Sequence, residues 1–241
     1  MATVAEHYAE HLAPIYVWMC GGLESALARG QAEIDAVCPD RQDGGSAVDL
    51  GAGFGMHAIA LARRGYSVIA VDSSPVLLET LQAQAGTLPV HAVNDDLLSF
   101  QRHLNAKVDL ILCMGDTLTH LPENQSVEQL FARVAESLHP GGRFIATFRD
   151  YSTPLDAEKR FVAVRSDDER ILTCFLEYFP GYVTVHDLLH ERQGVDWTLR
   201  VSTYRKLRLS PEWVIGALKA RGFVVRAEPG ISGMVRLVAT V

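Results

Sequence analysis

A glycine-rich segment between two apolar runs restricts the fold more than any other part of this chain. Residues 48–72 read VDLGAGFGMHAIALARRGYSVIAVD, with Gly51, Gly53 and Gly55 between a short apolar run and a helical pattern. Glycine permits a sharp turn and a close approach of the backbone to a ligand, and a helix that begins there offers free N–H groups. Asp72 ends the next apolar run, where a carboxylate can accept hydrogen bonds from both ribose hydroxyls. The segment therefore predicts a strand–turn–helix–strand unit that binds a nucleotide-like ligand.

The same alternation continues along the chain. It predicts strands at 47–50, 66–71, 89–93, 109–114 and 141–148, and helices at 56–65, 75–86 and 126–138. A helix at 210–222 and two strands at 223–228 and 234–241 follow near the end of the chain. Such alternation is typical of a parallel sheet covered by helices on both faces. We expect an α/β fold with a doubly wound, Rossmann-like, seven-stranded and mostly parallel sheet that ends in an antiparallel hairpin.

Two further segments flank or interrupt this core. Residues 1–45 have the apolar spacing of a helical extension, which we expect to act as a lid, and the turn-rich RQDGGS at 41–46 separates it from the core. Residues 151–209 contain period-two alternation at 171–179, 182–193 and 197–209, which predicts an antiparallel β insertion over a substrate site. The predicted core is thus divided into 46–150, which carries the glycine turn, and 210–241.

Composition excludes several classes of protein. The net charge of −7 is unfavourable for binding the phosphate backbone of a nucleic acid. The four cysteines lie far apart without a CxxC pair, which fits a reducing cytoplasm, and neither a disulfide framework nor a metal site is expected. No apolar run reaches the length of a membrane span. We expect a cytoplasmic protein that binds neither nucleic acid nor membrane; a homo-oligomer stays an open alternative.

Dinucleotides and S-adenosylmethionine both bind at such a glycine turn. A dinucleotide fingerprint requires GxGxxG, whereas here the third glycine comes one residue early and Met56 occupies its place. Polar residues also follow two later strands, in VNDD at 93–96 and in GDT at 115–117. The final two-strand hairpin is not needed in a dinucleotide-binding fold. These features favour S-adenosylmethionine, although a turn without any ligand is an alternative for the glycines alone.

Together these motifs resemble the class I S-adenosylmethionine-dependent methyltransferases, over residues 46–150 and from 210 to the end. Within that class, MGDTLTHLPE at 114–123 and FRDY at 148–151 are similar to the GNSFAHLPD and HRNYD stretches of glycine and sarcosine N-methyltransferases. The chain differs from them in that Asp116 and Asp150 replace asparagines and Phe148 replaces a histidine. These differences fall near the substrate, so the resemblance says least about the identity of the substrate.

The resemblance implies a set of cofactor-binding residues at the carboxyl ends of the strands. They are Asp49, Gly51, Ala52, Gly53 and Gly55 at the methionine half; Asp72, with Ser73 beside it, at the ribose; Asp95 or Asp96, with Leu97, at the adenine; and Met114, Gly115 and Thr117 along the length of the cofactor.

It also implies a catalytic group. His120 would face the reacting atoms, and Arg149 would bind the carboxylate of an amino acid; the alternatives are a structural histidine and a salt bridge to Asp150. Tyr16, Trp18 and Tyr151 are candidates for an aromatic lining, the first two as part of the lid.

The function implied is the transfer of a methyl group from S-adenosylmethionine to a small-molecule acceptor, such as the amine of a carboxylate-bearing metabolite like glycine or sarcosine. A small-molecule O-methyltransferase is an alternative, either without metal or with magnesium held by Asp116 and Asp150. An NAD-dependent oxidoreductase and a non-catalytic cofactor-binding protein are further alternatives. The sequence leaves open which atom of the acceptor is methylated.

Overall fold

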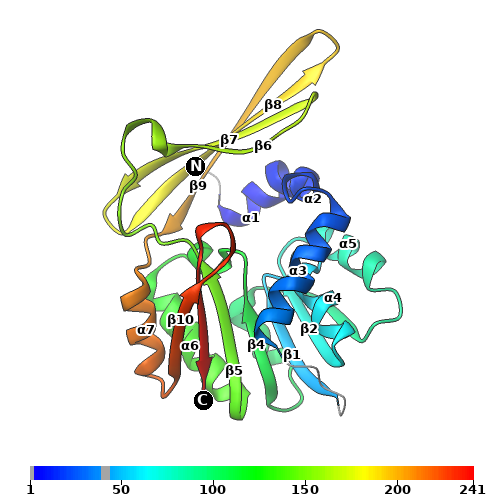
Figure 1. Ribbon diagram of the computed structural model, residues 1–241, viewed down its shortest axis with the longest axis vertical. Helices are drawn as coiled ribbons and strands as arrows, with labels where there is room; N and C mark the ends of the chain where they lie inside the picture. Colours follow the sequence, from blue (N-terminus) through cyan, green and yellow to red (C-terminus); the bar gives the residue numbers. More distant parts are fainter. Residues whose placement is uncertain (1–2, 39–43) are drawn as a thin grey trace.

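A seven-stranded sheet forms the centre of the molecule in the computed structural model, which describes residues 3–38 and 44–241 (Figure 1). Its order is β10-β11-β5-β4-β1-β2-β3. The strands are β1 (Gly45–Leu50), β2 (Tyr66–Asp72), β3 (Val90–Asn94), β4 (Val108–Cys113), β5 (Leu138–Phe148), β10 (Val224–Pro229) and β11 (Val235–Thr240). Strands β1 to β5 pair in parallel and β11 pairs antiparallel with both of its neighbours. The predicted fold class is therefore confirmed. The break predicted at 41–46 begins in residues 41–43, outside the described residues.

Helices cover both faces of this sheet. In Figure 1, α3 (Leu23–Val37), α4 (Met56–Arg63) and α5 (Pro75–Ala85) lie on one side, and α7 (Pro211–Lys219) lies on the other. Helix α6 (Asn124–Ser137) packs with α7 in the same core. Alternate residues of β1 belong to opposite cores: Val48 packs with the α6/α7 side, and Ala47 with the α3/α4/α5 side. This period-two division produces two apolar layers and exposes only the ends of the strands to ligands.

A second, antiparallel sheet crosses the top of the core in Figure 1. It consists of β6 (Phe161–Ser166), β7 (Arg170–Phe179), β8 (Tyr182–Gln193) and β9 (Asp196–Leu207), and we call it the insertion. Three of these strands follow the predicted ranges, whereas β6 was not predicted. The reason is physical: β6 is an edge strand whose side chains are mostly exposed, so it carries no alternation of buried and exposed residues.

The N-terminal segment lies between the insertion and the core (Figure 1). It is helical, as predicted, but is broken into α1 (Val4–His7), a π-helical turn (Tyr8–Leu12), a 3₁₀ turn (Ala13–Ile15) and α2 (Tyr16–Met19). His7 attaches this segment to the insertion: Nδ1 lies 2.7 Å from Ser202 Oγ, and Nε2 lies 3.1 Å from Asp187 Oδ2. Among the described helices, none combines the length and the apolar character needed to cross a bilayer.

Candidate functional site

The three glycines between β1 and α4 all adopt the left-handed backbone region, with φ of +73°, +55° and +91° for Gly51, Gly53 and Gly55. They differ in what surrounds them. A Cβ at Gly51 would lie 2.5 Å from Cγ2 of Thr117, and one at Gly55 would lie 2.7 Å from Cγ of Leu81. A Cβ at Gly53 would meet nothing closer than 3.9 Å. Packing therefore requires the first and third glycines, whereas the second leaves open space beside the backbone.

Asp72 is fixed beside this turn by the backbone. Its Oδ2 accepts a hydrogen bond from the N–H of Gly53 and its Oδ1 accepts one from the N–H of Ser74, each at 2.8 Å. Burial raises the pKa of the carboxyl, and the backbone N–H donors oppose that rise. Backbone hydrogen bonds thus hold the carboxylate beside the turn, and the ribose contact expected of Asp72 stays a prediction.

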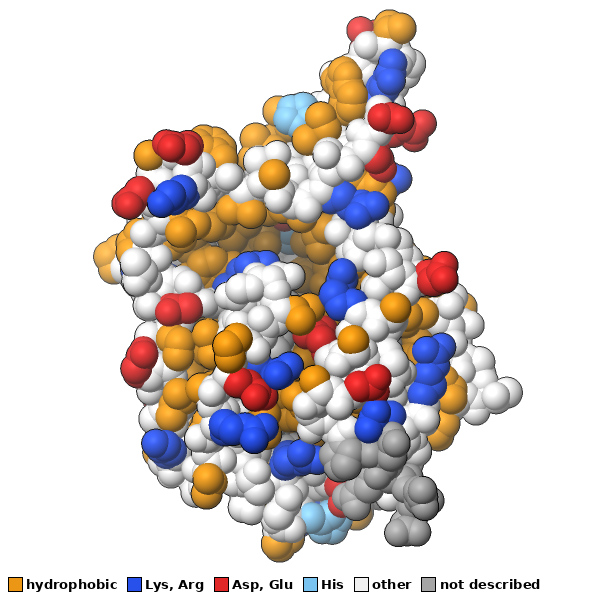
Figure 2. Space-filling view, viewed as in Figure 1, with side chains coloured by type: hydrophobic (Ala, Val, Ile, Leu, Met, Phe, Trp, Pro, Cys, Tyr) orange, Lys and Arg blue, Asp and Glu red, His pale blue; other side chains and the backbone are white. Residues whose placement is uncertain are grey.

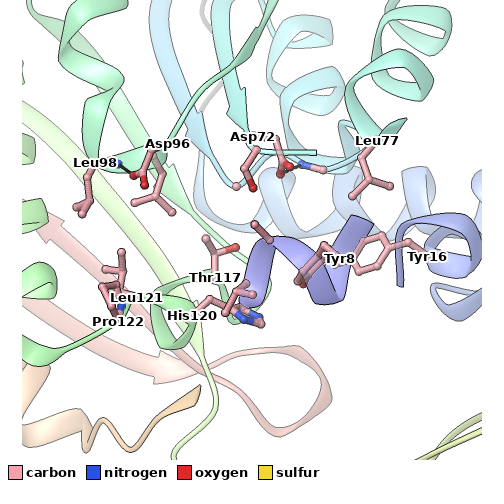
Figure 3. Close-up of a pocket in the computed structure, with 16 residues that line it drawn as sticks. Tyr8, Tyr16, Asp72, Leu77, Asp96, Leu98, Thr117, His120, Leu121 and Pro122 are labelled. Carbon is pink, nitrogen blue, oxygen red and sulfur yellow. Dashed lines mark hydrogen bonds between the residues drawn. The ribbon is translucent and has the colours of Figure 1, made fainter. Parts of the chain in front are cut away.

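A cavity of about 350 Å³ opens at this turn, a size within the range of small-ligand pockets. In Figure 3, Asp72 and Asp96 lie on one side of it, and Tyr8 and His120 on the opposite side. The N-terminal segment closes it with Val4, Ala5, Tyr8 and Tyr16. The space is therefore built from the glycine turn, the segment after β3, the turn after β4 and the N-terminal segment.

The predicted cofactor-binding residues separate into two groups. Those that line the cavity are Gly51, Gly53, Asp72, Ser73, Asp96, Leu97 and Thr117. Those that are not among its lining residues are Asp49, Ala52, Gly55, Asp95, Met114 and Gly115. Between the two acids at the adenine position, the structure favours Asp96, because Asp95 accepts a hydrogen bond from His103 Nε2 at 2.8 Å outside the cavity. The individual contacts to a cofactor stay predictions.

A second cavity, of about 750 Å³, shares part of its wall with the first. Both are lined by Val4, His120, Leu121 and Pro122. The second is completed by the β7–β8 turn at Pro180, Gly181 and Tyr182 and by Arg205, Lys206 and Leu207 of β9. Figure 2 shows that the surface is hollowed between the insertion and the core, with hydrophobic side chains in the hollow. The molecule thus offers two adjacent binding spaces.

His120 lies where the two cavities meet. Its ring stacks on that of Tyr204, with centroids 5.6 Å apart and planes 11° from parallel, and lies edge-on to Tyr8 at 5.6 Å. Nδ1 has no hydrogen-bond partner in the described parts of the chain. Burial, reinforced by the charge of Lys206, lowers the pKa of His120 to about 3. The imidazole is therefore neutral at pH 7 and can accept a hydrogen bond.

Asp116 is a buried carboxylate four residues before His120. Its φ of +74° is left-handed, a region that aspartate and asparagine tolerate better than most residues. Oδ1 accepts a hydrogen bond from the N–H of Arg149 at 2.9 Å, and Oδ2 accepts from Tyr151 Oη at 3.2 Å and from Lys206 Nζ at 2.6 Å. Burial would raise the pKa of Asp116, but the neighbouring charge of Lys206 holds it below its ordinary value. Both carboxylate oxygens of Asp116 therefore already accept hydrogen bonds from the protein.

Asp150 is the other carboxylate of the magnesium alternative. It is exposed and accepts a hydrogen bond from the N–H of Ser152.

The other predicted catalytic residues are only partly brought together. Tyr16 lines the first cavity, and Tyr151 is buried against Asp116. Arg149 lines neither cavity; its side chain is exposed and donates a hydrogen bond to the carbonyl of Ser232 at 3.0 Å. Trp18 also lies outside both linings and donates its indole N–H to Asp167 of the insertion. The predicted roles of these four residues stay predictions.

Lys206 lines the second cavity but was not among the site residues predicted from the sequence. It lies two residues after Tyr204 on β9, and both side chains are largely buried. A lysine at an inward position of an otherwise alternating strand is the signal that marks it, because a buried ammonium requires a partner.

Residues 47–142 match the family described as a methyltransferase domain. A glycine/sarcosine N-methyltransferase from Halorhodospira halochloris is 26% identical over 156 residues, which cover 63% of this chain and 58% of that protein. The chain thus spans less than two thirds of the length of this curated relative. Two solved structures share the fold: CcbJ methyltransferase from Streptomyces caelestis (TM-score 0.76, 19% identity, 96% of both chains) and an S-adenosylmethionine-dependent methyltransferase from Clostridium acetobutylicum ATCC 824 (TM-score 0.75, 16% identity, 94% of this chain and 97% of the other).

Residues 47–142 thus match a methyltransferase domain, and the whole chain shares the fold of S-adenosylmethionine-dependent methyltransferases. The residues of the first cavity are of the kind that could hold S-adenosylmethionine. The backbone at Gly53 borders open space that a Cβ would fill, and the carboxylate of Asp72 accepts a hydrogen bond from the N–H of Gly53. Beneath the turn, Asp49 is 1% exposed and its Oδ2 has no hydrogen-bond partner among the described residues. Such an orphaned buried oxygen is costly unless function retains it, and Gly51, two residues later, lines the cavity.

The protein should become more stable when the charge of Asp49 is removed. Burial raises the pKa of this carboxyl from 3.8 to about 6, so at pH 8 the folded state must hold an unfavourable charge. Asp49→Asn is expected to raise the free energy of unfolding at pH 8 by about 3 kcal/mol, measured by urea denaturation. A pKa raised by folding favours the folded state below the unfolded pKa, and that advantage is lost as the pH rises through the folded pKa. The gain should therefore vanish near pH 4; an equal gain at both pH values would contradict the burial of a charge.

Proposed function

We propose that this protein transfers a methyl group from S-adenosylmethionine in the first cavity to the amine of a small, carboxylate-bearing acceptor in the second. The observation that carries the proposal is that the two cavities meet at His120. A methyl transfer requires two ligands whose reacting atoms face each other across such a junction. The similarity to a glycine/sarcosine N-methyltransferase supports an amine as the acceptor.

In this proposal Asp72 binds the ribose hydroxyls, Asp96 and Leu97 flank the adenine, and Gly53 lets the backbone approach the methionine half. S-adenosylmethionine supplies a methyl group already activated on sulfur, so the protein mainly positions the acceptor and excludes water. Tyr8 and Tyr16 of the N-terminal segment cover the cofactor side.

His120 has a role on the acceptor side. An amine attacks only when it is neutral, and the neutral imidazole of His120 can accept a hydrogen bond from its N–H. We also propose a cytoplasmic location, because the four cysteines lie far apart in the sequence without a CxxC pair.

The experiment that tests the proposal measures release of S-adenosylhomocysteine by mass spectrometry, with glycine and sarcosine as acceptors. Asp72→Asn serves as the cofactor-site variant and is expected to weaken cofactor binding, because the amide offers one acceptor oxygen where the carboxylate offers two. His120→Asn is expected to bind cofactor normally and to lower turnover. Cofactor binding without product from either glycine or sarcosine would contradict methyl transfer to these amines.

A further inference from the structure

Strand β9 presents two cations to the second cavity, Arg205 and Lys206. The side chain of Lys206 is 11% exposed and its ammonium carries three hydrogen-bond donors. Within the described parts of the chain, Asp116 Oδ2 is the one hydrogen-bond acceptor found for it. Its other near neighbours are the ring faces of Tyr151 and Tyr204, at 5.9 Å and 5.8 Å. A largely buried ammonium that lines a cavity thus retains donors for a ligand.

Arg205 is the second cation. Its guanidinium lies 4.3 Å from the centroid of the Tyr182 ring, which orients it at the cavity without neutralising it. Among the described residues it has no carboxylate partner. Glu123 is the one acid among the residues that line this cavity, so its walls are more cationic than a chain of net charge −7 would suggest.

Arg149, the cation that the sequence predicted for a carboxylate, is placed differently. Its guanidinium donates to the carbonyl of Ser232 in the turn between β10 and β11 and lines neither cavity. The planar fork of an arginine suits a carboxylate, and Arg205 offers that fork at the cavity wall.

We propose that Arg205 and Lys206 bind the carboxylate of the acceptor and so direct its amine toward His120. This inference rests on the proposed function and specifies its acceptor site. His120 and Lys206 both line this cavity, and both lie close to the Tyr204 ring, at 5.6 Å between ring centroids and 5.8 Å from Lys206 Nζ. In an α-amino acid a single carbon separates the amine from the carboxylate, which suits two groups that are such near neighbours.

The test is calorimetric binding of sarcosine, and of its methyl ester, to the protein saturated with S-adenosylhomocysteine. Arg205→Met should raise the Kd for sarcosine about tenfold, because a charge-assisted hydrogen bond to the carboxylate is lost. The affinities for the ester and for S-adenosylhomocysteine should not change. Arg200→Met is the matched control, since Arg200 lies on the same strand, pairs with Glu191 and lines neither cavity.

Lys206→Met leaves Asp116 without its counter-charge, so Lys206 is tested in the double variant Asp116→Asn/Lys206→Met, which should also bind sarcosine about tenfold more weakly. Wild-type affinity in both variants would overturn the inference, as would a loss confined to Arg149→Met. Saturation with S-adenosylhomocysteine but no binding of sarcosine would overturn this inference and leave the proposed function to other acceptors. Failure to bind S-adenosylhomocysteine would remove the proposed function, and this inference with it.

Discussion

Lys206→Met should lower the free energy of unfolding by about 3–5 kcal/mol, because it leaves the carboxylate of Asp116 buried without a counter-charge. Asp116 is 5% exposed, and Lys206 Nζ lies 2.6 Å from its Oδ2. The remaining donors to Asp116, Tyr151 Oη and the N–H of Arg149, are neutral. Urea denaturation at pH 7 measures the loss.

Two comparisons separate charge from packing in this result. Arg205 is the exposed neighbour of Lys206, and Arg205→Met should change the free energy of unfolding by no more than about 0.5 kcal/mol. Asp116→Asn/Lys206→Met should recover much of the loss, because it removes both charges and asparagine still tolerates the left-handed backbone. If Lys206→Met alone cost less than about 1 kcal/mol, water would have to reach Asp116, and the buried ion pair would be refuted.

Gly53→Ala is expected to weaken the binding of S-adenosylhomocysteine by at least about 100-fold, while the free energy of unfolding falls by only about 1–2 kcal/mol. The new methyl group meets no protein atom closer than 3.9 Å, so the fold accommodates it. It occupies the cofactor side of the turn instead, where Gly53 lines the first cavity. Calorimetry and urea denaturation measure the two quantities on the same preparation.

Gly194→Ala is the matched control for the backbone. Gly194 has φ of +68°, a Cβ there would meet nothing within 4 Å, and it lies in the β8–β9 turn outside both linings. We expect a similar loss of stability with unchanged affinity. Gly51→Ala should differ from both and lose more stability, because its Cβ would lie 2.5 Å from Thr117. Normal affinity of Gly53→Ala would show that the cofactor binds elsewhere.

The glycine turn and the acid beside it, which line the first cavity, could be predicted from sequence because they are close along the chain. The turn that carries Gly53 and the carboxylate of Asp72 are 19 residues apart, and the strand–helix–strand unit between them fixes their geometry. The seven-stranded sheet followed from the same alternation. The three predicted strands of the insertion also followed from their pattern, whereas exposed β6 had none.

The wall of the second cavity, the proposed acceptor site, could not be predicted in the same way. Lys206 and Asp116 are 90 residues apart, and no local pattern specifies that β9 crosses the core at the turn after β4. The sequence located Arg149 correctly at the end of β5, but the direction of its side chain depends on the carbonyl of Ser232, 83 residues later. Position along a strand is a local property; the choice of hydrogen-bond partner is not.

The contacts of the insertion limit how it can be transferred between proteins. Lys206 of β9 is neutralised by Asp116 of the core, and Asp187 of β8, which is 2% exposed, faces His7 of the N-terminal segment. A graft of residues 161–207 onto another core would carry two buried charges whose partners remain behind. An exchange of acceptor specificity between related enzymes would therefore have to move the N-terminal segment and the turn after β4 together with the insertion, as one unit of design.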